Sequence, residues 1–330
     1  MSPVERVMCV LEGRRADRPP VCFWRHFSAE EVWGEAAVAA HVAHLEKYGL
    51  DFLKVMNDNP YPHEEMIGGV RELDELGELR GDEGGFGRQL ELVGRLREKV
   101  GGKVLMTTTV FNAWAVLRHL VRRPTKHNPP EMDGWGDEPS GRIRAWVAED
   151  EGAVKRAMDR IGAGLAGFAR RCIEAGADGV FLSVRDDWVD GPSQRGVYER
   201  VVRGSDLGIL RGAVRGRFNM LHVCGRAVDF RAFAEYPVDA INWADRAAGP
   251  TVEEARGWVR PAICGGVDNL STLMKGSEAD VEREVADALR QAGGRPIMVT
   301  PGCTYDPERV PRENLEAMVR AAAGLGGGGM

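Results

Sequence analysis

The chain has 330 residues, of which 43% are hydrophobic and 28% are charged, and its formal net charge is -6. These proportions are typical of a soluble globular protein, and no apolar stretch approaches the length that crosses a bilayer. The negative net charge gives no general attraction to nucleic acid or to anionic lipid, so neither is expected as a partner.

The chain begins with MSPVERVMCVLEGRRADRPP, which reads as a short helix followed by a turn. This segment lacks the basic start and the apolar stretch of a secretion signal. The six cysteines of the chain are too sparse for a secreted disulfide scaffold and are better explained as reduced thiols. We therefore expect a cytoplasmic protein whose cysteines are available to bind metal.

Short apolar segments recur along the chain, and most are followed by a polar turn and a stretch with helical spacing. This alternation predicts parallel strands joined by crossover helices. We expect strands at residues 21–26, 51–56, 103–111, 179–184, 218–224, 240–244, 262–267 and 297–303. Eight strands predict an α/β fold, a (β/α)8 TIM barrel with an N-terminal helical extension. An open doubly wound sheet is less favoured, because no strand is followed by a GxGxxG or GxxxxGK[ST] loop.

Helices are expected between these strands, for example at residues 29–48, 151–175, 252–259, 279–291 and 311–323. Ser277 precedes an acidic first turn as an N-cap would, and Pro311 suits a first helical position.

Two segments depart from the alternation of strands and helices. Residues 124–142 form a long polar segment with several prolines and glycines, which predicts either a binding loop or a surface excursion. The tail at 324–330, GLGGGGM, has low complexity and is expected to be disordered. No internal repeat or dividing linker is present, so residues 1–330 are expected to form a single domain.

Three residues with metal-binding side chains lie at the ends of expected strands. His222 and Cys224 are separated by one residue in LHVCG, so on a strand their side chains project to the same face. Cys303 ends the last expected strand in PGCTY, where Gly302 permits a sharp turn. The carboxyl ends of barrel strands form the rim that carries the active site in barrel enzymes. Two thiolates and one imidazole suit zinc and leave one position for water or substrate.

These residues also have a simpler explanation. Cysteine is often buried as a small apolar residue, and histidine often satisfies a hydrogen bond in the core, so a His-x-Cys pair alone is a weak signal. A shared ion also requires side chains from two strands that are not neighbours to reach one point. The remaining cysteines are expected to be packing residues: Cys9, Cys22, Cys172 and Cys264.

The chain as a whole resembles the uroporphyrinogen decarboxylase superfamily and, within it, the zinc-dependent methylcobamide:thiol methyltransferases of the coenzyme M type. The likeness runs from LEGRRADRPPV and FWRHF through LHVCG and INWADR to CGGVDNLSTLMKGSEADVEREV and PGCTYDPERVPRENLEAMVRAA. The methyltransferase branch has a His-x-Cys pair followed much later by one cysteine. In this chain those positions are His222, Cys224 and Cys303.

The resemblance implies an enzyme that moves a methyl group from a corrinoid to a small thiol activated as a zinc thiolate. The expected cofactors are Zn2+ and methylcobamide or cobalamin as the methyl donor. The expected partners are the thiol and a corrinoid or corrinoid protein. A zinc-dependent epoxide:thiol alkyltransferase and a non-catalytic corrinoid- or zinc-binding module are alternatives. The oligomeric state is left open, with a homodimer as one option.

Two departures separate the chain from the decarboxylase branch. That branch has two arginines in its N-terminal segment, of which only Arg25 has a counterpart, while Ala29 or its neighbour stands at the second position. Cys303 stands where that branch has a histidine. A porphyrinogen with four acidic groups would therefore be held poorly. Asp58 in VMNDNP corresponds to the catalytic aspartate of the decarboxylases, so decarboxylation with Asp58 is a further alternative.

Three aspartates follow expected strands at the rim, namely Asp58, Asp245 and Asp268. Each is a candidate to orient a zinc ligand, to accept the thiol proton or to be a weak fourth ligand, and Asp58 and Asp268 are the favoured catalytic candidates. Aspartate after a strand also commonly caps a turn or a helix, which is the structural alternative.

Besides Asp245, which is also expected to bind substrate, three further residues are candidates for this role. Arg25 could bind an anionic group such as a sulfonate, or form a structural ion pair. Trp188 and Tyr305 follow the fourth and eighth expected strands, where an aromatic face could pack on a corrinoid ring. Ordinary core packing is the alternative for both rings.

Overall fold

The computed structural model describes residues 1–122, 138–185, 195–225 and 230–324. Within them, seven parallel strands form one sheet in which each strand pairs with the next along the chain. The strands are β1 (Phe52–Val55), β2 (Leu105–Phe111), β3 (Gly179–Arg185), β4 (Met220–Cys224), β5 (Ala240–Trp243), β6 (Ala262–Val267) and β7 (Ile297–Pro301). Their residues are buried almost throughout, as expected for a parallel sheet covered on both faces.

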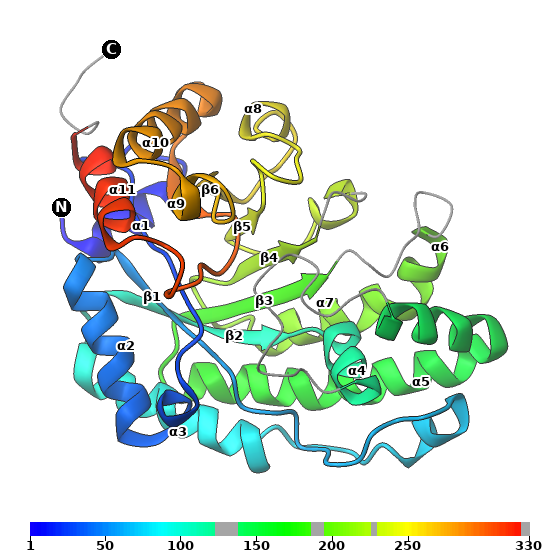
Figure 1. Ribbon diagram of the computed structural model, residues 1–330. Coiled ribbons are helices and arrows are strands. Elements are labelled where there is room, and N and C mark those ends of the chain that lie inside the picture. The colour runs from blue at the N-terminus through cyan, green and yellow to red at the C-terminus, as the bar shows by residue number, and fades with distance from the viewer. Residues whose placement is uncertain (123–137, 186–194, 226–229, 325–330) are drawn as a thin grey trace.

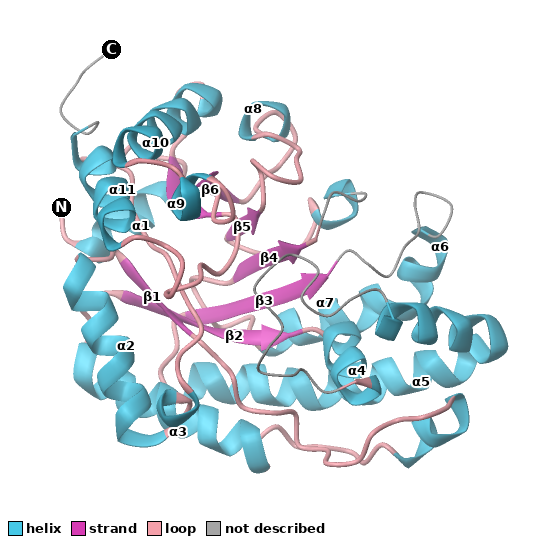
Figure 2. Cartoon of the chain, viewed as in Figure 1, coloured by secondary structure: helices cyan, strands magenta, loops and turns pink. Residues whose placement is uncertain are grey.

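Helices surround the curled sheet (Figures 1 and 2). Among them, α2 contacts β1, α5 contacts β2 and β3, and α10 contacts β6 and β7. The α-helices are α1 (Pro3–Leu11), α2 (Gly34–Tyr48), α3 (Gly84–Val100), α4 (Ala113–Val121), α5 (Glu138–Glu174), α6 (Arg195–Val197), α7 (Arg203–Gly212), α8 (Val252–Ala255), α9 (Thr272–Lys275), α10 (Glu278–Ala292) and α11 (Arg312–Gly324). Short 3-10 turns occur at η1 (Ala29–Glu31), η2 (Val70–Glu75) and η5 (Phe230–Phe233), and η4 (Tyr198–Val202) is a π-helical turn.

The expected first strand at 21–26 is replaced by a single parallel bridge between Val21 and Val299. Val299 N donates to the Pro20 carbonyl over 2.8 Å, and Asp51 N donates to the Val21 carbonyl over 3.0 Å. This short segment therefore lies between β7 and β1 and joins the two edges of the curled sheet.

The bridge does not grow into a strand because the next backbone groups bind elsewhere. The Trp24 carbonyl accepts from Tyr305 N over 3.1 Å, and His44 Nε2 lies 3.1 Å from the Phe23 carbonyl. These partners belong to a loop and to a helix rather than to a neighbouring strand. The prediction of eight strands is therefore corrected to seven strands and a closing bridge in the described part of the chain.

Two helix predictions also change. The expected helix at 29–48 is divided into η1 and α2, and Gly34 at the junction has a φ of +70° that side chains rarely adopt. The expected loop at 124–142 ends earlier, because residues 138–142 already belong to α5, while 124–137 lie outside the described residues. Asp150 has non-helical angles within α5, and its carboxylate accepts from Ala153 N over 2.8 Å. The helix expected from residue 151 is therefore the second part of α5.

The C-terminal helices follow the sequence closely. Ser277 caps α10 and forms a capping box with Asp280, as its position before an acidic turn predicts. The helix α11 begins at Arg312, one residue after Pro311, and ends at Gly324. The rest of the expected tail, 325–330, lies outside the described residues. No helix in the described ranges combines the length and the apolar character needed to span a membrane.

A buried aspartate holds the N-terminal segment against the sheet. The Asp51 side chain is 1% exposed and accepts from Arg6 Nη1 over 2.6 Å and from Arg18 Nη1 over 2.7 Å. It also accepts from Val21 N over 2.7 Å, next to the closing bridge. One carboxylate therefore connects α1, the following turn and the start of β1.

We predict that Asp51→Ala lowers the free energy of unfolding by about 3 kcal/mol, because it removes the buried acceptor of Arg6, Arg18 and Val21 N and leaves Arg6 with only the more exposed Asp17. Urea denaturation of the metal-free protein measures this change. Asp159→Ala is the control, since it removes an exposed ion pair with Lys155 and should change the free energy by less than about 0.5 kcal/mol. Equal effects of the two substitutions would contradict the anchoring role of Asp51.

Candidate metal centre

The ends of β4 and β7 bring His222, Cys224 and Cys303 together. His222 and Cys224 project to the same face of β4, because residues two apart on a strand share a face. Cys303 follows β7 directly after Gly302, where a Cβ atom would lie only 2.7 Å from the Ala244 Cα. Glycine at this position therefore lets the chain pass close to the end of β5 and carry Cys303 to the rim.

The geometry of the three side chains fits a zinc ion. Their ligand atoms lie within 4.8 Å of one another, and Cys303 Sγ is 3.5 Å from His222 Nε2. Tetrahedral zinc with bonds of about 2.3 Å to sulfur and about 2.0 Å to nitrogen places such atoms about 3.6 Å apart. His222 is 4% exposed, while both cysteines are half-buried. In the described ranges, no second group of three such residues has this spacing.

Asn242 on β5 fixes the orientation of the His222 ring. Its Oδ1 lies 2.6 Å from His222 Nδ1, and its Nδ2 donates to the Cys264 carbonyl, to Thr300 Oγ1 and to the Pro301 carbonyl over 3.0 to 3.1 Å. Because three oxygens surround the amide nitrogen and two of them are carbonyls that take its two protons, Oδ1 accepts from His222 Nδ1. The lone pair of Nε2 then faces the thiols, as metal binding requires.

Sequence reasoning did not identify Asn242. It lies in INWADR, and it pairs directly with His222 in the parallel register of β4 and β5. The signal that could have found it is this register, since a polar residue beside a predicted ligand on the adjacent strand is a candidate for orienting it.

The pKa values of the two thiols are shifted in opposite directions in the metal-free protein. A hydrogen bond from Cys224 lowers the pKa of Cys303 against the effect of burial, and hydrogen bonds from Thr304 and the positive charge of Lys54 lower it too. The same hydrogen bond, together with burial, raises the pKa of Cys224. Arg185 Nη1 lies 4.0 Å from Cys224 Sγ and brings a second positive charge to this end of β4. A metal ion bound to both sulfurs would displace any proton that they hold, since both ligands must be thiolates.

The expected catalytic residue Asp58 lies after β1 and is paired with a histidine. Asp58 Oδ1 is 2.6 Å from His26 Nδ1. Burial raises the pKa of Asp58. The hydrogen bond and charge of His26, the charge of Lys54 and a hydrogen bond from Phe27 N lower this pKa by a larger amount, so it lies below the usual range. Asp58 is therefore ionised at neutral pH. Sequence reasoning had assigned no role to His26.

The other two aspartates are engaged in local structure. Asp268 accepts from Leu270 N over 2.7 Å, and from Ser271 N and Oγ over 3.0 and 2.6 Å. Asp245 is 1% exposed and accepts from Gly266 N over 2.9 Å. Burial raises its pKa to about 6. Neither carboxylate belongs to the metal-binding group.

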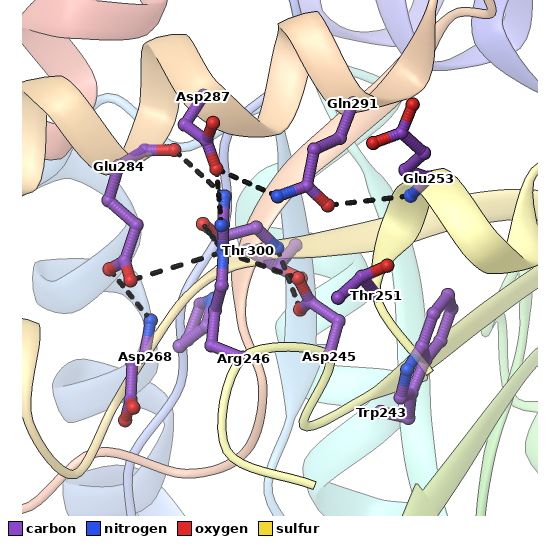
Figure 3. A network of polar contacts seen from close by, with 12 residues as sticks. Trp243, Asp245, Arg246, Thr251, Glu253, Asp268, Glu284, Asp287, Gln291 and Thr300 are labelled. Atoms are coloured by element: carbon purple, nitrogen blue, oxygen red, sulfur yellow. Dashed lines mark hydrogen bonds and ion pairs between the residues drawn. The ribbon is translucent and has the colours of Figure 1, made fainter. Parts of the chain in front are cut away.

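Figure 3 shows the polar network around Asp245. Arg246 reaches the Gly266 carbonyl with its Nε and the Asp287 carboxylate of α10 with its Nη1. Asp268 joins through its backbone, because Asp268 N donates to Glu284 Oε2 over 3.0 Å. The network therefore ties the loops after β5 and β6 to α10.

The expected substrate-binding residues have different surroundings. Tyr305 is 3% exposed. The centroid of its ring lies 5.9 Å from that of Phe23 and 6.2 Å from that of His44, so Tyr305 packs in the core. The Arg25 guanidinium lies 4.5 Å from the centroid of the Phe27 ring, and no carboxylate of the described residues is within ion-pair distance of it. Trp188 lies outside the described residues.

The chain is similar to proteins of known structure and family. No match is found among curated protein sequences. A solved structure described as a methyltransferase from Methanosarcina mazei has 18% identity and a TM-score of 0.72, over 98% of this chain and 99% of that one. A B12-independent methionine synthase from Shewanella sp. W3-18-1, in complex with selenomethionine, has 11% identity and a TM-score of 0.57, over 94% of this chain and 98% of that one. These likenesses concern the fold, whereas the family profile described as uroporphyrinogen decarboxylase (URO-D) matches residues 39–325, so the chain belongs to the uroporphyrinogen decarboxylase family.

Proposed function

We propose that this protein is a zinc-dependent methyltransferase that moves a methyl group from a corrinoid to a small thiol. The observation that carries the proposal is the meeting of His222, Cys224 and Cys303 at the ends of two strands that are not neighbours. Further support comes from the fold, which is shared with proteins described as a methyltransferase and a methionine synthase. The corrinoid as donor rests on the sequence resemblance.

In this proposal the three side chains hold zinc and, as three ligands rather than four, leave room for the substrate sulfur. Bound zinc supplies the Lewis acidity that makes a thiol an anionic nucleophile at neutral pH. With a methylated corrinoid bound as donor, the thiol would give up its proton and its sulfur would form a bond to the methyl carbon, while the electron pair of the broken carbon–cobalt bond would leave with the corrinoid. Asn242 contributes by holding the His222 ring in the orientation that binds metal.

Two rim groups are assigned supporting roles. Asp58 is proposed as the acceptor of the thiol proton, because it is ionised and its partner His26, with a side chain 55% exposed, connects it to solvent. Arg25 is proposed to bind an anionic group of the thiol, since its guanidinium fork suits a sulfonate or a carboxylate. Asp245 and Asp268 are assigned to the stabilisation of the rim loops.

The decarboxylase alternative is favoured by the family and by the position of Asp58 after β1. A porphyrinogen with four acidic groups needs several cations, however, and the N-terminal segment offers Arg25 without the second arginine of the decarboxylases. Decarboxylation by a protein free of zinc is the outcome that would favour this alternative.

The proposal is tested by measuring zinc and methyl transfer on the same preparations. We predict about one zinc per chain and demethylation of methylcobalamin that depends on an added thiol. Cys224→Ala and Cys303→Ala are each expected to lose zinc and activity, because two remaining ligands hold the ion far less tightly. Metal analysis by mass spectrometry and the absorbance of methylcobalamin with a panel of thiols provide the two measurements.

Cys172→Ala is the matched control, since this buried thiol lies on the outer helix α5 and its loss should leave zinc and activity unchanged. A fully active preparation without zinc would overturn the proposal. A zinc protein that alkylates thiols with an epoxide but not with methylcobalamin would instead be the alkyltransferase. A zinc protein that turns over neither donor would be the non-catalytic module.

We also predict that Asn242→Ala weakens zinc binding by about 10- to 100-fold, because the His222 ring loses the partner that sets its orientation. Competition with a chromophoric chelator measures this affinity. Asn219→Ala is the control: Asn219 is also buried, but its amide binds Val180 N and the Ala213 carbonyl at the opposite end of β4. Equal zinc affinity in the two variants would show that Asn242 acts only on stability.

A further inference from the structure

A lysine lies in the interior of the curled sheet, which is an unusual place for a charged side chain. Lys54 is on β1 and is 5% exposed. It shares a strand face with Phe52, because the two residues are two apart. The centroid of the Phe52 ring lies 5.1 Å from that of Phe218, two residues before β4, so this face of β1 is directed across the interior.

The surroundings of Lys54 do not neutralise its charge. Its Nζ donates to the Met56 thioether over 3.1 Å and lies 4.8 Å from the Phe181 ring centroid and 5.9 Å from that of Trp24. No carboxylate of the described residues lies within ion-pair distance. Burial lowers the pKa of Lys54 to about 8, so it is still mostly charged at neutral pH. A buried ammonium group without an anion destabilises a fold, which indicates that this lysine serves another purpose.

Lys54 is close to the metal-binding group. The Phe181 ring contacts Lys54 and also stacks on the His222 ring, with a centroid distance of 5.3 Å and an interplanar angle of 25°. The charges that act on the ammonium are those of Asp58 after β1, Cys303 after β7, and Cys22 beside the closing bridge. The positive charge of Lys54 therefore acts on the expected ligand Cys303 and lowers its pKa.

A count of charges indicates what this ammonium could balance. In the proposed centre, the two thiolates of Cys224 and Cys303 would balance the two charges of zinc, and the nearby Arg185 and Asp58 carry charges of opposite sign. A substrate thiolate would add one negative charge in a partly buried place, where an unbalanced charge is costly. Lys54 brings one positive charge to the interior beside this centre, where its ammonium and the His222 ring both contact the Phe181 ring.

We propose that Lys54 is a positioning residue whose charge stabilises the thiolate that substrate brings to the His222, Cys224 and Cys303 centre. This inference rests on the proposed function. It assigns to Lys54 a role toward the reacting sulfur itself, and not toward the remainder of the thiol molecule. A thiol without any charged group should therefore depend on Lys54 as strongly as an anionic thiol does.

The experiment compares Lys54→Met with the wild type in protein loaded with Co(II), where thiolate-to-cobalt absorption reports binding. Two probes are used: 2-mercaptoethanol, which is neutral, and 3-mercaptopropionate, which is anionic. We predict that Lys54→Met weakens binding of both thiols by about tenfold, while Lys54→Arg keeps most of the affinity. Lys47→Met is the control, since this exposed lysine of α2 should leave binding unchanged.

Stability provides a second readout that separates function from structure. Replacing a buried, unpaired charge by an apolar side chain is expected to raise the free energy of unfolding of the metal-free protein. A lysine with a structural role would instead lower it when replaced. If Lys54→Met does not fold, Lys54→Gln gives the same comparison, since it also removes the charge.

Several outcomes would overturn the inference. Weaker binding of 3-mercaptopropionate alone would mean that Lys54 binds the anionic tail. Unchanged binding of both thiols, with lower stability, would mean that Lys54 is structural. A wild-type protein that binds cobalt but no thiol would remove the proposed function, and the role of Lys54 with it. The first two outcomes leave the proposed function intact, so the two failures are distinguishable.

Discussion

The closure of the curled sheet is the constraint on which the candidate metal centre depends. β4 and β7 are separated by two strands in the sheet, so their ends face each other only because the sheet curves. The bridge between Val21 and Val299 joins its edges, and the Asp51 carboxylate holds the bridging segment and two arginines in place. An aspartate on the surface could not hold this segment in place, because exposed ion pairs contribute little to the stability of a fold.

The interior of the sheet is unusually polar near the rim, and its polar groups are connected. Asn242 bonds to residues of three other strands and orients His222, while the Phe181 ring contacts both the His222 ring and Lys54. Buried polar groups are costly unless they are paired. The pairs formed by Asn242 offset that cost, whereas Lys54 contacts only the Met56 thioether and aromatic rings and has no anion within ion-pair distance in the described part of the chain. Because of this contrast, we assign the Asn242 amide to the orientation of His222, and we assign the Lys54 ammonium to balancing the charge of a substrate thiolate.

Much of the sheet could be predicted because buried parallel strands are continuous apolar runs, and the run at 262–267 coincides with β6. The segment 21–26 also begins with a run of apolar residues, but it lacks strand neighbours beyond its first residues, and an apolar run does not reveal its partners. The same limit applies to Asn242, whose place beside His222 depends on the register of two strands. Asp268 differs, because the serine three residues later is a local signal for the turn that it caps.

The most direct test of the proposed centre is X-ray absorption at the zinc edge, before and after addition of a thiol. The zinc-loaded protein should give two sulfur ligands at about 2.3 Å and nitrogen or oxygen ligands at about 2.0 Å. A thiol substrate should raise the number of sulfur ligands to three, with one sulfur more than Cys224 and Cys303 supply. A spectrum with fewer than two sulfur ligands, or one that no thiol changes, would contradict a thiol-activating zinc site.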